Sequence, residues 1–198
     1  MRKYKIVLVA ACAALMLLPA NLLAQEEEKD MRPVRETFNG TLLGDQQTGT
    51  SPRDKGLELI IHHRFGTMEN GLTDLYGIYA PSNIRLGLSF GITEKLMVGF
   101  GTEKNNKLQE FYAMYNILQQ TRGGSIPVGI SYYVNMAIDA RNEEVFGENY
   151  AFTNRLSYFH QIIIDRKFGD RLSVQLAPSF AHFNAVDSVW HNDYIGVS

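Results

Sequence analysis

The chain has 198 residues, of which 45% are hydrophobic, and 19 Lys and Arg residues stand against 21 Asp and Glu. A formal net charge of −2 without any basic stripe argues against a nucleic-acid partner, because nucleic-acid binders neutralise phosphates with clustered cations. A single cysteine, Cys12, excludes a framework of disulfides.

Residues 1–24 have the form of a secretory signal peptide. Three cations precede the apolar run from Ile6 to Leu18, and we place cleavage after Ala24, in preference to Ala20, because a polar stretch follows it. The run is shorter than the ~20 residues of a membrane-spanning helix, which disfavours an anchor. Cleavage removes three of the 19 cations, none of the 21 acids and Cys12, so we expect an exported chain of formal charge −5 without thiol chemistry.

Residues 25–55 are rich in Glu, Asp, Gln, Thr, Gly and Pro, with one short strand expected at 37–43. Such a composition is typical of a solvated segment that buries little apolar surface. We therefore interpret it as a polar periplasmic linker, in preference to a plug or a binding element.

From residue 56 onward, apolar residues alternate with small polar ones, as they do along β-strands. In the clearest example Ile84, Leu86 and Leu88 alternate with Gly87 and Ser89. Small neutral partners are typical of the crowded inside of a tube, whereas a face kept soluble by water would carry more charge. Seven such segments and the beginning of an eighth lie at 57–66, 82–92, 96–104, 109–118, 127–139, 154–168, 171–183 and from 193 onward.

Most of these segments have the ~9–11 residues that cross an outer membrane when the strand is tilted. The connections alternate between tight turns, as at 92–96 and 168–172, and longer polar loops, as at 66–81, 140–153 and 184–192. Short periplasmic turns opposite longer external loops are typical of membrane barrels. The sequence therefore predicts an all-β fold, an antiparallel up-and-down transmembrane β-barrel over residues 56–198.

The last candidate strand, 194–198, holds five residues and ends on Ser198. Five residues are too few to span an apolar band ~25 Å tall at about 3.3 Å per residue. We therefore expect this chain to be the N-terminal portion of a larger barrel, with seven strands, the start of an eighth and two unpaired edges.

Four segments together resemble an uncharacterised β-barrel family of Bacteroidota outer membranes, a domain of unknown function. They are Glu58–Gly66, Asn83–Leu88, Arg155–Tyr158 and Asp170–Leu176. The resemblance covers roughly residue 56 to the end of the chain and implies the fold and the compartment. It implies no established activity and therefore no catalytic residue.

Strand alternation selects the side chains that would line the lumen, since residues of one parity face one side. His62 shares a face with Glu58 and Arg64, and plain charge pairing there is a simpler interpretation than a dedicated site. The full set of lumen candidates is Glu58, His62, Arg64, Arg85, Glu103, Asn135, Arg155, Gln161, Asp165 and Gln175.

His160 does not fit this pattern, because its parity places it on the lipid side near mid-membrane. A polar ring there is costly unless it is neutral and hydrogen-bonded. The alternatives are a bulge in the strand or packing of that face against protein.

The chain shows no catalytic or cofactor motif. The loop at 139–153 is acidic, but it lacks the spacing and the fixed glycine of an EF-hand, and no G-x-S-x-G elbow occurs. We therefore predict no enzyme, no cofactor and no metal site.

We predict an integral outer-membrane barrel, acting as a narrow channel or as a structural component of the membrane. Its partners would be outer-membrane lipid and, as further candidates, other envelope proteins. The alternative is a secreted soluble β-calyx that binds an apolar ligand, which would turn the apolar side chains inward and expose the glycines and serines.

Overall fold

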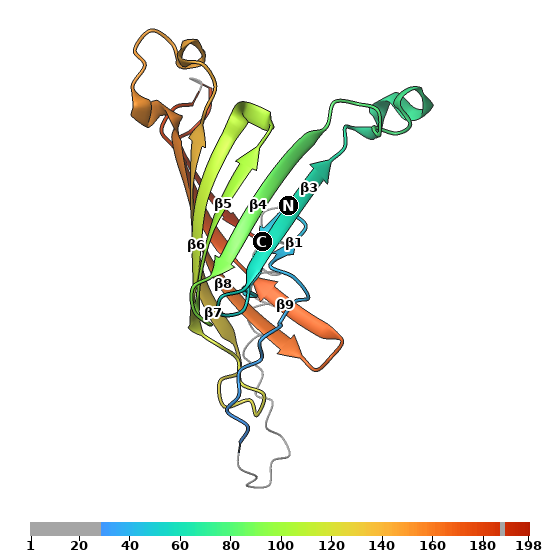
Figure 1. Ribbon diagram of the computed structural model, residues 1–198, viewed down its shortest axis with the longest axis vertical. Coiled ribbons are helices and arrows are strands. Elements are labelled where there is room, and N and C mark those ends of the chain that lie inside the picture. Colours follow the sequence, from blue (N-terminus) through green and yellow to red (C-terminus); the bar gives the residue numbers. More distant parts are fainter. Residues whose placement is uncertain (1–28, 187–188) are drawn as a thin grey trace.

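Successive antiparallel strands form one curled sheet in the computed structural model, which describes residues 29–186 and 189–198 (Figure 1). The strands from residue 57 onward follow one another across the sheet in chain order, except that the consecutive strands Leu172–Leu176 and Pro178–Phe183 both pair with Leu156–Phe168, and this confirms the predicted all-β up-and-down order. The strands are β3 (Leu57–Arg64), β4 (Asn83–Gly91), β5 (Leu96–Glu103), β6 (Leu108–Leu118), β7 (Gly129–Asp139), β8 (Leu156–Phe168), β9 (Leu172–Leu176), β10 (Pro178–Phe183) and β11 (Asp193–Val197).

The sheet is open between β3 and β11, which form its two edges and do not pair with each other within the described ranges. The predicted segment at 171–183 is divided into β9 and β10 at Ala177, yet both halves pair with β8 in the same register. Pro178 has no N–H to donate, so the ladder is interrupted there without shifting. Ala177 instead exchanges two backbone hydrogen bonds with Ser198, at 2.8 and 3.2 Å.

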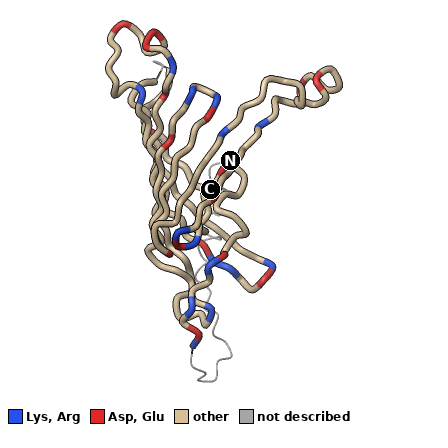
Figure 2. Tube along the Cα trace, viewed as in Figure 1, with Lys and Arg blue, Asp and Glu red and all other residues tan. Residues whose placement is uncertain are grey.

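The connections differ in length at the two ends of the strands, as the sequence predicts. Long connections carry the short 3₁₀ helices η1 (Met68–Asp74), η3 (Glu143–Phe146) and η4 (Phe152–Arg155), and the brief η2 (Asn105–Lys107) joins β5 to β6. Charged residues lie mainly in loops and turns at the ends of the strands (Figure 2). None of the helices in the described part of the chain is long and apolar enough to cross a membrane.

The two faces of the sheet differ sharply in chemistry. Along β4, Ile84, Leu86 and Leu88 are 37–43% exposed on the convex face, while Gly87 and Ser89 are buried on the concave face. The same outward set continues across the sheet as Leu57, Leu59, Ile61, Phe90, Phe100, Phe111, Tyr115, Tyr132, Ile162, Phe180 and Ile195. A soluble calyx requires the opposite orientation, so that alternative is wrong.

Large side chains fill the centre of the concave face. Met97, Met114, Tyr133 and Ile163 are at most 7% exposed and form one cluster with Tyr112 and Ala177. Their strands approach one another because the sheet curls, which lets a single-layer sheet bury a core on one side.

The interpretation of residues 25–55 as a solvated linker is wrong for the part that the structure describes. Residues 29–55 are here called the N-terminal segment. Its part from 37 to 51 lies against the concave face of the sheet, while residues 30–34 lie beside the turn that follows β6, where Val34 donates to the Gln120 carbonyl (Figure 1). Thr41, Gln47 and Thr48 are at most 6% exposed. The strand expected at 37–43 is reduced to β1 (Leu42–Leu43), which pairs with β2 (Gln46–Gln47). The predicted signal peptide, 1–24, lies outside the described residues.

Candidate functional site

The concave face carries nearly all of the predicted lumen candidates. Strand alternation places Glu58, His62 and Arg64 of β3 on this face, and β4 adds Arg85 directly opposite His62. Glu103, Asn135, Gln161, Asp165 and Gln175 follow on β5, β7, β8 and β9. We call this set of side chains, together with Glu110 and Tyr112, the inner wall.

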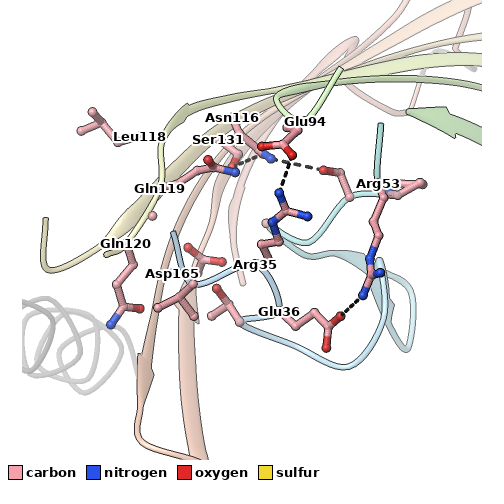
Figure 3. A pocket seen from close by; sticks show the side chains of 16 residues that line it. Arg35, Glu36, Arg53, Glu94, Asn116, Leu118, Gln119, Gln120, Ser131 and Asp165 are labelled. Atoms are coloured by element: carbon pink, nitrogen blue, oxygen red, sulfur yellow. Dashed lines mark hydrogen bonds and ion pairs between the residues drawn. The ribbon is translucent and has the colours of Figure 1, made fainter. Parts of the chain in front are cut away.

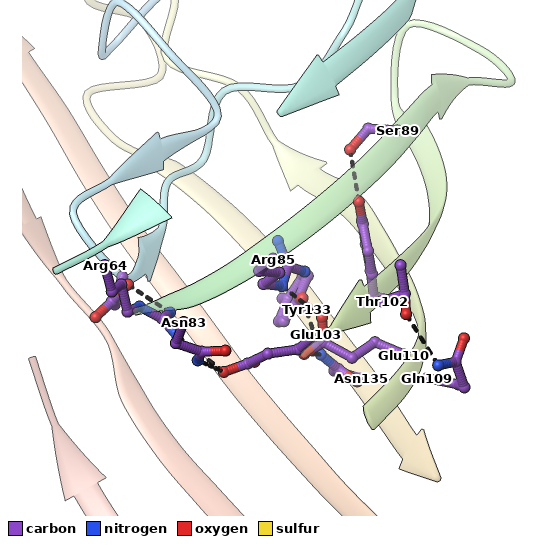
Figure 4. Close-up of polar contacts among 12 residues, drawn as sticks. Arg64, Asn83, Arg85, Ser89, Thr102, Glu103, Gln109, Glu110, Tyr133 and Asn135 are labelled. Carbon is purple, nitrogen blue, oxygen red and sulfur yellow. Dashed lines mark hydrogen bonds and ion pairs between the residues drawn. The ribbon is translucent and has the colours of Figure 1, made fainter. Parts of the chain in front are cut away.

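One ion-pair cluster lies at the end of the inner wall where β3 and β5 end and β4 begins. The Arg64 guanidinium contacts the Glu103 carboxylate at 3.0 Å and the Asp45 carboxylate at 2.8 Å, so it joins the sheet to the N-terminal segment. Asn83 also donates to Glu103 (Figure 4). The Arg64 guanidinium holds the pKa of Asp45 below its usual range, so the carboxylate stays charged to a lower pH than that of an ordinary aspartate.

A second cluster lies deeper. Arg85 Nε contacts the Glu110 carboxylate at 2.5 Å, and the two side chains are only 11% and 13% exposed. Asn135 donates to the other carboxylate oxygen of Glu110 at 3.2 Å (Figure 4). Arg85 also lies over the Tyr112 ring at 5.7 Å, and the Tyr112 hydroxyl hydrogen-bonds Ser89 at 3.0 Å. This cluster occupies the middle of the inner wall with paired charges.

The sequence prediction missed Glu110. Its segment is the least regular of the candidate strands, because the residues around it, Leu108–Tyr112, do not alternate clearly between apolar and polar. Pairing gave no clear signal either, because the sequence prediction already placed another acid, Glu103, on the same face as Arg85, and Glu103 lies directly opposite Arg85 in the sheet.

The N-terminal segment is hydrogen-bonded to strands far from it in sequence. Thr41 donates to Glu58 at 2.7 Å, and Gln175 donates to the backbone carbonyl of Gln47 at 2.9 Å. Three further contacts extend the attachment along β6, β8 and β9: Asn116 to Ser51 at 3.2 Å, Gln161 to Gln46 at 3.2 Å, and Ser173 to the Thr37 carbonyl at 2.5 Å. These bonds explain why a polar segment can be buried.

Asp165 marks the tightest contact between the N-terminal segment and the sheet (Figure 3). Asp165 is 3% exposed, and its carboxylate lies between two glycines, Gly49 of the segment and Gly129 of β7. A Cβ atom on Gly49 would lie 2.3 Å from Asp165 Oδ2, and one on Gly129 would lie 2.0 Å from Oδ1. Only glycine permits this approach at either position.

Arg155 does not belong to the inner wall. It ends η4 in the loop before β8, where its guanidinium lies 4.9 Å from the centres of the Phe146 and Tyr150 rings. It donates to the Asp139 carbonyl at 2.7 Å, while Arg141 contacts the Asp139 carboxylate at 2.6 Å. The start of the acidic loop is thus held by two arginines, and no group of three or more potential metal ligands occurs in the described part of the chain.

His160 faces the convex side, as its parity requires. Its Nδ1 lies 2.7 Å from the Tyr132 hydroxyl, and its ring stacks between Tyr132 and Phe180. β8 pairs with β7 and β10 without a register shift, so the alternative of a bulge is wrong. The hydrogen bond and the ring contacts explain how a polar ring is accommodated among apolar neighbours.

Comparison with known proteins gives one result. A family described as a membrane bound beta barrel domain (DUF5777) matches residues 38–198, which include most of the N-terminal segment as well as the sheet. Neither the curated proteins nor the solved structures contain a significant match.

Proposed function

The chain belongs to the DUF5777 family of membrane-bound β-barrel domains, and we propose that it forms a narrow polar channel in the outer membrane that the N-terminal segment holds closed. One observation carries the proposal: residues 37–51 lie over the concave face and are hydrogen-bonded to the inner wall. A barrel with an occupied lumen conducts little until that occupant moves.

Export and strand length support the outer membrane as the compartment. The predicted signal peptide directs the chain out of the cytoplasm, and strands can span a bilayer only as a closed sheet. Exported proteins that span a membrane in this way belong to the bacterial outer membrane. Lipid is accordingly the partner we propose for the convex face. The proposal includes no catalytic step.

The same contacts indicate how the channel would open. Arg64 contacts Asp45 of the N-terminal segment and Glu103 of the wall. When the segment leaves, the guanidinium therefore keeps the Glu103 carboxylate as its partner. Asp165 is different, because its burial depends on the close approach of Gly49. The Gly49 contact is therefore where a substitution should displace the segment most selectively.

We expect Gly49→Val to raise the mean conductance in planar bilayers several-fold over that of the unchanged protein, since the Val side chain would overlap the buried Asp165 carboxylate and force the two to move apart. Gly40→Val is the matched control, because a Cβ on Gly40 would meet only the Leu42 carbonyl, at 3.7 Å. Heat-modifiable gel mobility would confirm that both variants are folded. Equal conductance of the two folded variants would contradict the plug, and a silent bilayer in every case would favour a structural role.

A further inference from the structure

The charges of the inner wall do not balance. The wall as defined above carries two guanidinium groups, those of Arg64 and Arg85, and four carboxylates, those of Glu58, Glu103, Glu110 and Asp165. Each guanidinium already contacts one carboxylate of the wall, Arg64 that of Glu103 and Arg85 that of Glu110. The other two carboxylates, on Glu58 and Asp165, form no ion pair with any described residue.

The N-terminal segment covers both of these carboxylates with uncharged groups. The Thr41 hydroxyl donates to Glu58 at 2.7 Å. Gly49 lies so close to Asp165 that a Cβ atom there would meet Oδ2 at 2.3 Å. The stretch over the concave face, residues 37–51, contains a single charged residue, Asp45, and neither lysine nor arginine. The segment therefore supplies no cation to either carboxylate.

Withdrawal of the segment would uncover both carboxylates together, because one stretch of chain contacts both. Water would then reach them, and a hydrated carboxylate is charged at neutral pH. The two ion pairs within the wall do not involve the segment, so they remain when it leaves. The open lumen would thus carry an excess of two negative charges.

Both carboxylates lie near the same end of the wall. Glu58 is the second residue of β3, and Asp165 lies three residues before the end of β8, which a tight turn follows. Lys167 shares their face but lies closer to the turn, where its ammonium group donates to the Glu36 carbonyl at 3.0 Å and salt in the solvent screens its charge. Carboxylates on the wall of a pore attract cations and repel anions.

We propose that the open channel conducts small cations in preference to anions, with Glu58 and Asp165 as the residues that select them. A permeating cation contacts the two carboxylates that the segment covers in the closed state. An anion meets only guanidinium groups that are already paired. The inference rests on the proposed function and deepens it, because it names the charge of the solutes that the channel passes.

The test is the reversal potential of Gly49→Val channels in a planar bilayer that separates two concentrations of potassium chloride. The inference predicts that potassium permeates several-fold more readily than chloride. Adding Glu58→Gln and Asp165→Asn removes both charges and keeps the shape of both side chains, so Val at position 49 still displaces the segment. These two changes should lower the ratio of potassium to chloride permeability towards one.

The matched control adds Glu143→Gln and Glu144→Gln to Gly49→Val, because these exposed acids of η3 lie outside the inner wall. It should keep the preference for potassium, and heat-modifiable gel mobility shows that each variant is folded. A folded Gly49→Val channel that passes chloride as readily as potassium, or an equal loss of preference in the control, would overturn the inference and leave the channel itself standing. A folded Gly49→Val variant that carries no current would contradict the proposed function and this inference with it.

Discussion

Replacing Leu88 with arginine is expected to lower the free energy of unfolding from a bilayer by about 2–4 kcal/mol, the cost of a cation at the midplane of a membrane barrel. Leu88 lies at the middle of β4 on the convex face, opposite Leu59 of β3 and Phe100 of β5. It is 42% exposed on the isolated chain. In water such a position would tolerate arginine with almost no change in stability, so the expected loss depends on acyl chains covering this face.

The matched control is Leu72→Arg, because Leu72 is 76% exposed in η1, outside the strands. Urea unfolding in phospholipid vesicles, followed by heat-modifiable gel mobility, measures both variants against the unchanged chain. Equal stability of the Leu88 and Leu72 variants would mean that the convex face does not contact lipid.

Replacing Arg85 with methionine is expected to destabilise the fold by about 3 kcal/mol, because Glu110 would remain buried without its cation. The interaction is central to the inner wall, since Asn135 also depends on the Glu110 carboxylate. Removing both charges, in Arg85→Met with Glu110→Leu, should restore most of the lost stability, because no unpaired ion is then buried.

The same unfolding measurement checks this cycle. Arg32→Met is the control: Arg32 also forms an ion pair, with Asp30, but its side chain is 73% exposed, and its loss should be undetectable. A double variant that loses as much stability as the sum of the two single variants would show that the charges act independently and that the cluster is not a unit.

Local pattern was sufficient to predict the strands and their faces. Alternation in the segment 83–91 depends only on neighbouring residues, and it identified both Leu88 as outward and Ser89 as inward before any contact was known. Turn lengths are equally local, so the alternation of tight and long connections was also predicted from the sequence.

Contacts between distant segments were the part that the sequence did not reveal. Thr41 and Gln47 are polar, so composition suggests that water surrounds them, yet they are buried because Glu58 and Gln175 supply hydrogen bonds from strands far along the chain. Similarly, Gly49 carries no sign in sequence that it lies against Asp165. Burial of a polar segment depends on partners that local composition cannot identify.

The most direct measurement of lipid contact uses two conservative substitutions, Phe100→Trp on the convex face and Phe159→Trp on the concave face, each combined with Trp190→Phe to remove the native fluorophore. Phe100 is 41% exposed, whereas Phe159 packs against the core cluster. In vesicles of acyl-brominated phospholipid, Trp at position 100 should be strongly quenched and Trp at position 159 should not. Equal quenching, or stronger quenching at position 159, would contradict a sheet whose apolar face contacts lipid and whose polar face encloses the N-terminal segment.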